Sequence, residues 1–387
     1  MANFGDYQTG IYAEGMLGGK APDIPTGMVQ LEARAADVLS ADAAGYILPS
    51  AGSGATTRAN RAAFDRWRIV PRMMRGSAHR DLSCTVLGTE LPAPVLLAPI
   101  GVQTLAHPEG ELATARAAAA VGLTYTHSTA SSHSIEQAAE ASGDGSRWYQ
   151  LYWPNEPELC ESFLARAAAA GYSTLVVTLD TTTLGWRPAD LDRGFLPFLR
   201  GEGIATFLSD PVFRSSLAKP PEEDLSAAVM RWASVFPNPT LSWDQIPFLR
   251  ERWSGPIVLK GIQSVDDARL AVQHGVDGVV VSNHGGRQVD GATGSLDQLG
   301  PIAAAVGAEL TVLFDSGVRT GADIVKALAL GAQAVFVGRP YLFGLALGGQ
   351  AGVEHVLRCL LAELDLALTL SGYPDPASLS PEALQRS

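Results

Sequence analysis

The sequence predicts an α/β protein, specifically a (β/α)8 TIM barrel with an N-terminal helical segment and a long insertion after the fourth strand. From about residue 91 onward, short β-rich apolar runs alternate with Ala-rich helical stretches, the pattern of successive βα units around a parallel sheet. Eight such runs can be counted. Eight units close a barrel, whereas a doubly wound sheet more often has five or six strands. With 387 residues, of which 47% are hydrophobic, the chain can bury a large core.

The expected organisation is one domain over residues 1–387. Residues 1–90 look mainly helical and are predicted to wrap the bottom and rim of the barrel, which residues 91–375 form. The gap of roughly 75 residues after the fourth strand far exceeds a normal connection. Residues 188–250 are therefore predicted to form an insertion over the catalytic face that acts as a lid, with a disordered surface excursion as the alternative. The eight strands are expected at residues 94–98, 123–126, 147–152, 174–178, 256–260, 278–282, 310–314 and 334–337.

Charge and cysteine content exclude several classes of protein. The net charge of −12 argues against non-specific binding to nucleic acid or to an anionic membrane. The 3 cysteines form no Cys-x-x-Cys pair, so neither a disulfide framework nor a metal site is expected. A reducing, cytoplasmic location fits best, and we expect neither a secretion signal nor a membrane span.

The heptapeptide Ser-Asn-His-Gly-Gly-Arg-Gln at residues 282–288 directly follows the sixth predicted strand. His284 and Arg287 therefore lie just past the C-terminal end of a barrel strand, where barrel enzymes keep their catalytic groups. A histidine with a pKa near neutrality can take a proton, and an arginine can hold a carboxylate with two hydrogen bonds. The motif indicates a base beside a binding site for an acid, although a polar surface loop is the alternative for this segment alone.

The other predicted strands also end in groups suited to ligand binding. The first leads into the apolar turn Ala98-Pro99-Ile100, which suits packing against a flat ring. Any one of the polar strand-end residues could be an ordinary partner of the backbone, but together they indicate a site on one face of the barrel. These polar residues are Ser128, Gln150, Tyr152, Thr178, Asp180, Arg187 and Lys260.

Glycine and arginine follow the last two strands, in the segments Asp315-Ser316-Gly317-Val318-Arg319 and Gly338-Arg339-Pro340. This is the position at which barrels hold phosphate through backbone amides and a helix N-terminus. The pattern predicts a phosphorylated cofactor, with two ordinary glycine turns as the alternative.

The motifs at residues 282–288 and 315–319 resemble those of the FMN-dependent 2-hydroxy acid oxidases and dehydrogenases. The resemblance covers roughly residue 46 to the C-terminus. Within that family, residues 3–7, 185–188 and 195–201 resemble the lactate 2-monooxygenase branch. The resemblance implies FMN as cofactor, a small-molecule 2-hydroxy acid and O2 as partners, and a homotetramer or homo-octamer.

The resemblance also implies roles for matched residues. His284 would be the base, Asp180 would stabilise its protonated form, and the substrate would be bound by Arg187, Arg287, Tyr46 and Tyr152. FMN would be held by Ala98, Pro99, Ile100, Ser128, Gln150, Thr178, Lys260, Ser282, Asp315, Gly317, Arg319, Gly338 and Arg339.

Two positions depart from the family pattern. After Tyr46 the family usually has a glycine-rich turn followed by an acidic pair, whereas residues 50–55 here read Ser-Ala-Gly-Ser-Gly-Ala. Ala130 stands where glycolate-oxidising relatives carry a bulky aromatic residue, so an acid larger than lactate is predicted to fit.

The expected activity is FMN-dependent oxidation of an L-2-hydroxy acid, with lactate as first candidate and O2 as acceptor. If the 2-oxo acid stays bound under the lid, oxidative decarboxylation gives acetate, CO2 and water; early release gives the 2-oxo acid and H2O2. The oxidase alternative extends to aromatic substrates such as mandelate. Two further alternatives are a quinone- or cytochrome-linked dehydrogenase and a non-enzymatic barrel that binds a phosphorylated ligand.

Overall fold

The computed structural model describes residues 3–76 and 80–387 and contains a parallel eight-stranded sheet. The strand order is β4-β11-β10-β9-β8-β7-β6-β5, and a bridge between Leu96 and Thr124 joins the first strand to the last. The predicted (β/α)8 barrel is thereby confirmed. The strands are β4 (Val95–Leu97), β5 (Tyr125–Ser128), β6 (Arg147–Leu151), β7 (Leu175–Thr178), β8 (Ile257–Ile262), β9 (Gly278–Val281), β10 (Thr311–Phe314) and β11 (Ala334–Val337).

All eight predicted strands are present, and the largest difference in position concerns β5. This strand begins at Tyr125, whereas the apolar run suggested residue 123. The ladder to β6 starts only at Tyr125, and Thr124 makes only the isolated bridge to β4. Ser128 is therefore the last residue of the strand and does not follow it.

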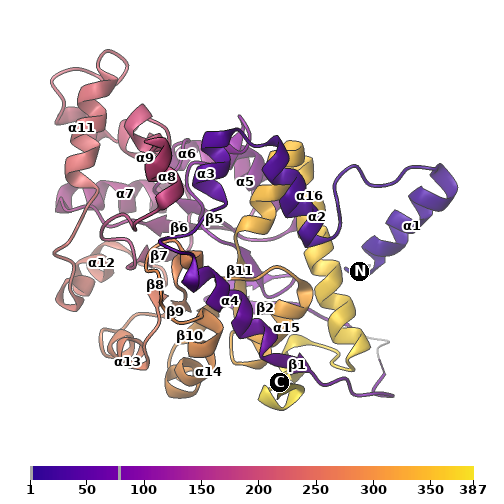
Figure 1. The fold of residues 1–387 in the computed structure, drawn as a ribbon. Helices are drawn as coiled ribbons and strands as arrows, with labels where there is room; N and C mark the ends of the chain where they lie inside the picture. The colour runs from indigo at the N-terminus through magenta and orange to yellow at the C-terminus, as the bar shows by residue number, and fades with distance from the viewer. Residues whose placement is uncertain (1–2, 77–79) are drawn as a thin grey trace.

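Helices surround the barrel, one after each strand (Figure 1). Parallel strands need such crossovers because the chain must return to the same edge before the next strand begins. Alanines of α5 lie buried where this helix packs against α6 and α16. The helices are α5 (Gly110–Val121), α6 (Ile135–Ser142), α7 (Pro157–Ala169), α12 (Ile246–Arg252), α13 (Val265–Gln273), α14 (Ser295–Val306), α15 (Gly321–Ala329) and α16 (Arg339–Leu370).

The interior of the barrel is filled by apolar side chains, so the barrel is a core and not a channel. Trp148 of β6 and Phe336 of β11 pack together inside it. A hairpin of β2 (Cys84–Val86) and β3 (Thr89–Leu91) joins this cluster, and the Trp148 indole donates a hydrogen bond to Thr89 (3.1 Å).

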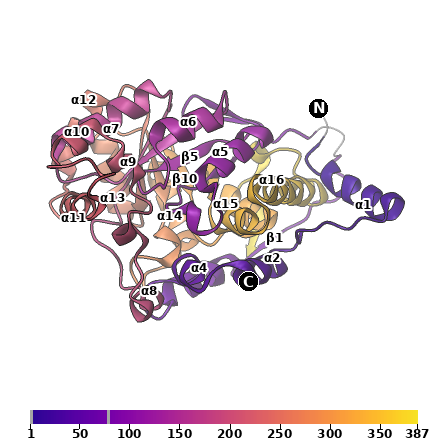
Figure 2. The ribbon, with the colours of Figure 1, turned by 90° about the horizontal axis from the view of Figure 1, so that it is seen from above.

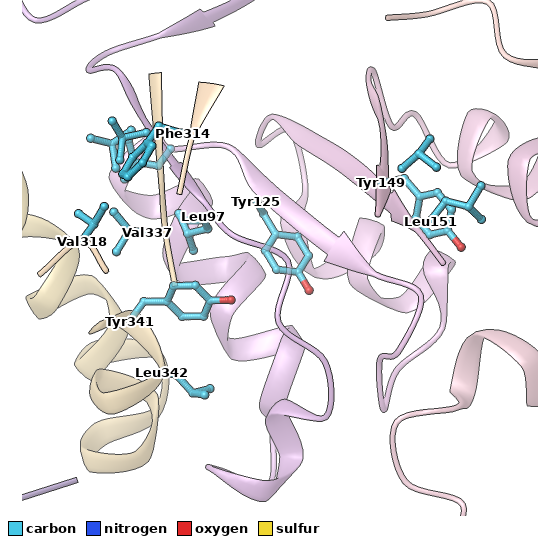
Figure 3. Close-up of a cluster of buried hydrophobic side chains, with 14 of the residues drawn as sticks. Leu97, Tyr125, Tyr149, Leu151, Phe314, Val318, Val337, Tyr341 and Leu342 are labelled. Atoms are coloured by element: carbon cyan, nitrogen blue, oxygen red, sulfur yellow. The ribbon is translucent and has the colours of Figure 1, made fainter. Parts of the chain in front are cut away.

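A second buried layer lies between the strands and the outer helices (Figure 3). Tyr341 of α16 belongs to this layer, and its hydroxyl donates a hydrogen bond to the backbone oxygen of Ala98 (2.8 Å). That contact fixes the turn that follows β4.

The N-terminal segment contributes α1 (Asp6–Gly18), α2 (Met28–Val38), α3 (Ala41–Ile47) and α4 (Ala55–Asp65), followed by β1 (Trp67–Ile69). The β1 strand pairs antiparallel with β12 (Leu384–Arg386), which joins the end of the N-terminal segment to the C-terminus. Helix α1 projects from the barrel and buries no side chain, whereas α4 packs against the segment that carries His284 (Figures 1 and 2).

Residues 188–250 fold into α8 (Pro188–Arg193), α9 (Ala205–Leu208), α10 (Pro211–Ser215) and α11 (Leu225–Val235), and α12 begins near their end. Phe198, Phe207, Phe213 and Trp232 are buried there, and they join the layer between the strands and the outer helices, since Phe207 packs on Phe163 of α7. In Figure 1 α9 and α11 stand at the left of the barrel, and α8 lies beside α3. In the described ranges, no helix combines the length and apolar character needed to cross a membrane.

Candidate active site

A cavity of about 1110 Å³, partly open to solvent, lies at the C-terminal ends of the barrel strands. All eight strands or the loops after them contribute to its wall. The predicted site residues in the wall are Tyr46, Ala98, Pro99, Ile100, Tyr152, Arg187, Lys260, His284, Arg287, Asp315, Gly317, Arg319, Gly338 and Arg339. The others, Ser128, Gln150, Thr178, Asp180 and Ser282, are not part of the wall.

His284 and Asp180 form a hydrogen-bonded pair. Nδ1 of His284 lies 2.8 Å from Oδ1 of Asp180, and Nε2 lies 3.5 Å from the hydroxyl of Tyr152. An ionised carboxylate only accepts, so Nδ1 carries the hydrogen and Nε2 is left as the acceptor in the neutral ring. The imidazole can therefore take a proton at the atom beside Tyr152.

The surroundings keep this pair in the charge state that a base needs. Burial lowers the pKa of His284, and the attraction of Asp180 offsets only part of that effect. Burial alone would raise the pKa of Asp180, but His284 and Lys260 outweigh it and hold the pKa below its ordinary value. At neutral pH the histidine is thus uncharged and the aspartate is ionised.

Two arginines stand in the same wall. Arg187 donates from Nε to the backbone oxygen of Arg287 (3.1 Å), and Arg287 donates to the backbone oxygen of Pro49 (3.1 Å). The guanidinium of Arg287 also lies 5.2 Å from the ring centre of Tyr46. Burial and then repulsion by Arg187 lower the pKa of Arg287 to about 10. A carboxylate between the two guanidinium groups would relieve that repulsion.

Polar side chains link adjacent strands beside the cavity. Ser128 donates to Gln150 (2.9 Å), and the Gln150 amide donates to Thr178 (3.0 Å). Nζ of Lys260 lies 3.0 Å from Ser282 and 3.1 Å from the carboxylate of Asp315. Burial would lower the pKa of Lys260, but Asp315 and Asp180 together hold it above its ordinary value. A permanent cation is therefore placed in the wall, where it can face an electron-rich ring.

The ends of β10 and β11 form a cationic corner. Arg339 donates to the backbone oxygens of Ile47 (3.3 Å), Pro49 (3.2 Å) and Gly285 (3.2 Å). Burial, followed by repulsion from Arg287 and Arg319, lowers its pKa to about 9. Arg339 is also the first residue of α16, which is kinked at Gly348 and Gly349 and whose N-terminus favours an anion.

This arrangement fits the predicted phosphorylated cofactor. Glu32 reaches the corner only through a contact of 3.8 Å to Arg319, so the buried positive charge there is incompletely balanced. Gly338 lies beside the apolar turn, within van der Waals range of Ala98 and Ile100. The corner therefore offers cationic side chains and a helix N-terminus to an anionic group, and the turn offers an apolar surface.

Several residues of the site were not predicted. Thr181 contacts both Asp180 (3.2 Å) and Nδ1 of His284 (3.3 Å), and its position next to Asp180 was the available signal. Gln288 binds Arg187 and is the last residue of the heptapeptide. Phe198 and Phe236 also line the cavity; Phe198 lies in the segment 195–201 that carries the family resemblance, whereas no sequence pattern marks Phe236.

Comparison with known proteins gives a consistent result. Residues 35–386 match the protein family described as FMN-dependent dehydrogenase. An FMN-dependent alpha-hydroxy acid dehydrogenase of Penicillium citrinum is 49% identical over 387 residues, which is 99% of this chain and 96% of that protein. An L-lactate oxidase of Lysinibacillus sphaericus is 43% identical over 348 residues, 90% of this chain and 89% of that protein. Among solved structures, mandelate oxidase with (S)-4-hydroxymandelic acid matches with a TM-score of 0.83 and 37% identity, covering 94% of this chain and 99% of that one.

Proposed function

Since the chain belongs to the FMN-dependent dehydrogenase family, we propose that it oxidises an L-2-hydroxy acid with O2, lactate being the first candidate, and that it decarboxylates the bound product to acetate, CO2 and water. FMN is its cofactor, and 2-hydroxy acid oxidation is its reaction class. One observation carries the finer proposal: His284, which is paired with Asp180, stands in the wall of the same cavity as Arg187 and Arg287.

Each of these groups has a distinct task in the proposed reaction. Arg187 and Arg287 bind the substrate carboxylate, and Tyr46 and Tyr152 hydrogen-bond the substrate. Nε2 of His284 takes the proton of the substrate hydroxyl, and Asp180 stabilises the imidazolium that results (2.8 Å). FMN, when bound, accepts the two electrons and the hydrogen that leave the substrate carbon and passes the electrons to the acceptor.

We assign the FMN site to the residues around the apolar turn and the cationic corner. The turn Ala98-Pro99-Ile100 would pack on the ring, and Lys260 would stabilise negative charge on it. Ser128, Gln150, Thr178 and Ser282 supply hydrogen bonds to the ring or ribityl chain. Arg319, Arg339, Gly317 and Gly338, with Asp315 beside them, form the phosphate end.

The wall around the substrate favours an apolar side chain. Ala130, Phe198 and Phe236 line the cavity, and the small side chain of Ala130 leaves space there. This space, together with the likeness to mandelate oxidase, favours an aromatic 2-hydroxy acid such as mandelate as the second candidate substrate.

The fate of the 2-oxo acid depends on how long it stays bound. We propose that residues 188–250, which place Phe198 and Phe236 in the cavity wall, act as a lid that retains it. Peroxide formed beside a retained pyruvate would decarboxylate it. For lactate the balance is one O2 consumed for one acetate, one CO2 and one water.

The test is to mix the purified FMN-loaded protein with L-lactate, first without and then with O2, and to quantify acetate, pyruvate and H2O2 per O2 consumed. Acetate without free H2O2 is the expected result. Pyruvate with an equal amount of H2O2 would identify an oxidase. Flavin bleaching by mandelate alone would identify the aromatic substrate, and bleaching without O2 consumption would identify a dehydrogenase. The variant His284→Ala is the control for bleaching that does not need the base.

A further inference from the structure

The side-chain amide of Gln288 bridges two parts of the site. Its Nε2 donates to the backbone oxygens of Asp180 (2.8 Å) and Thr183 (3.0 Å), and its Oε1 accepts from Nη2 of Arg187 (2.8 Å). Carbonyl oxygens only accept and a guanidinium only donates, so a single orientation of the amide satisfies all three contacts. Gln288 is therefore held in one orientation.

The contact to Arg187 determines where that guanidinium points. Arg187 donates from Nε to the backbone oxygen of Arg287 and from Nη2 to Gln288, so residues 287 and 288 hold its position with two hydrogen bonds. A guanidinium has five N–H donors, and three stay available for a ligand. Because Arg187 is part of the cavity wall, these donors can serve a carboxylate there.

The contact to Asp180 reaches the base. The backbone oxygen of Asp180 is held by Gln288, and the carboxylate of the same residue holds His284 (2.8 Å). The backbone around Gly185 packs tightly against residues 287 and 288, since a Cβ at Gly185 would lie 2.7 Å from the backbone oxygens of both Arg287 and Gln288. A displacement of Gln288 would therefore shift both Arg187 and, through Asp180, His284.

We propose that Gln288 is a positioning residue that couples the carboxylate clamp to the His284–Asp180 pair. The nature of the bound acid rests on the proposed function, whereas the coupling rests on the three hydrogen bonds. Gln288 itself acts through Arg187 and Asp180, so its loss should weaken binding of a carboxylate and also slow the chemical step.

Two variants distinguish the role of the amide oxygen, which accepts from Arg187, from the role of the amide NH2, which donates to Asp180 and Thr183. Gln288→Met keeps the length and removes all three hydrogen bonds. Gln288→Glu keeps an acceptor for Arg187 but sets a carboxylate against the oxygens of Asp180 and Thr183. The matched control is Gln263→Met, because the Gln263 amide also makes two side-chain hydrogen bonds (2.9 and 3.2 Å, with Ser295 and Thr293) but bonds neither Arg187 nor Asp180.

The experiment titrates oxalate into each oxidised FMN-loaded protein and follows the flavin absorbance, and then measures kcat and KM across pH with the best 2-hydroxy acid. We expect Gln288→Met to raise the Kd of oxalate about tenfold or more, because the Arg187 guanidinium loses its hydrogen bond to Gln288 and is no longer held in position. KM should rise in parallel, kcat should fall, and the acid limb of kcat/KM should move. Gln288→Glu should also weaken oxalate binding, since its charge competes for Arg187.

A Kd within twofold of wild type in Gln288→Met, or an equal loss in Gln263→Met, would overturn the inference. If Gln288→Met does not fold, Gln288→Glu decides by the same criterion. If wild-type protein binds oxalate but oxidises no 2-hydroxy acid, the proposed function is refuted. The oxalate titration still tests whether Gln288 positions Arg187. Wild-type protein that binds no oxalate would overturn the clamp and this inference together.

Discussion

His284 occupies an unfavourable backbone conformation. Its φ is 59°, and Ser316, which follows the neighbouring strand β10, has a φ of 84°, both in the left-handed region that non-glycine residues rarely adopt. The hydroxyl of Ser316 accepts from the N–H groups of Asn283 (3.3 Å) and Gly285 (3.0 Å), which flank the histidine. The strained turn is thus held by its neighbours, and it directs the imidazole toward Asp180 and Tyr152.

The pair His284–Asp180 predicts a defined pH dependence. Neutral His284 is the active form, so activity is present above its pKa and is lost as the pH falls through it. Asp180 raises that pKa, whereas burial, Lys260 and Arg187 lower it. Asp180→Asn should therefore move the acid limb of kcat/KM to lower pH, and kcat should fall by about 10²–10⁴ because the imidazolium loses its partner.

The measurement is a pH–rate profile of wild type and variant with the same acid. Thr181→Ala is the matched control, since Thr181 also contacts Nδ1 of His284 (3.3 Å) but carries no charge. An acid limb that stays in place in Asp180→Asn would contradict the assignment of this carboxylate.

The size of the side chain at position 130 should determine the preference between mandelate and lactate. Its side chain lines the cavity and is nearly buried (6% exposed), so a larger group there takes space from the substrate. Ala130→Phe should lower kcat/KM for mandelate about 10-fold or more relative to that for lactate, because the aromatic side chain of the acid loses its place. The ratio of the two kcat/KM values is the readout, and an unchanged ratio would place the substrate side chain elsewhere.

At the scale of elements, an aromatic cluster connects helix α11 with Tyr46 and Tyr152. Trp232 of α11 packs against Phe198 (5.0 Å between ring centres) and Phe236 (5.1 Å). Phe198 in turn contacts Tyr46 (6.3 Å), and Phe236 contacts Tyr152 (5.4 Å). The same aromatic cluster therefore supports the cavity wall and the side chains proposed to bind the substrate.

Removal of Trp232 tests the proposed lid. Trp232→Ala should lower the stability of the fold by about 3–5 kcal/mol, the usual cost of removing a buried large aromatic side chain. It should also loosen the segment, so that more 2-oxo acid leaves early and the yield of free H2O2 per O2 rises.

Thermal unfolding and the peroxide yield are measured on the same preparation. Trp243→Ala is the control, because Trp243 stacks on His274 (5.5 Å) and lies outside the aromatic cluster. An equal peroxide yield in wild type and Trp232→Ala would show that residues 188–250 do not retain the product.

At the scale of the molecule, the sequence predicted what depends on local pattern. The strands were predictable because buried parallel strands read as short apolar runs, and the heptapeptide and the last two strand ends marked the site by position. The helices of residues 188–250 could not be predicted, because helices as short as α9 and α10 form only through tertiary packing. The role of the β2–β3 hairpin against Trp148 likewise depends on contacts between residues distant in sequence, which no local pattern records.

The whole molecule should be markedly more stable with FMN than without it. Arg287 and Arg339 have pKa values lowered to about 10 and about 9, so the protein without ligand holds buried charges that repel each other. FMN at about 100 times its Kd should add about 2.7 kcal/mol to the free energy of unfolding, and removal of FMN should lower the Tm accordingly.

Arg339 should contribute much of this effect, because it stands at the N-terminus of α16 and in the cavity wall. Arg339→Met should raise the Kd of FMN about tenfold or more through loss of a charge-assisted hydrogen bond, and should weaken competition by inorganic phosphate. Quenching of FMN fluorescence gives the Kd, and Arg34→Met, which changes an arginine of α2 that bonds the backbone oxygen of Asp23, is the control. If both variants bind FMN as wild type does, the phosphate lies elsewhere, and Arg339 serves only the backbone of Ile47, Pro49 and Gly285 that it already holds.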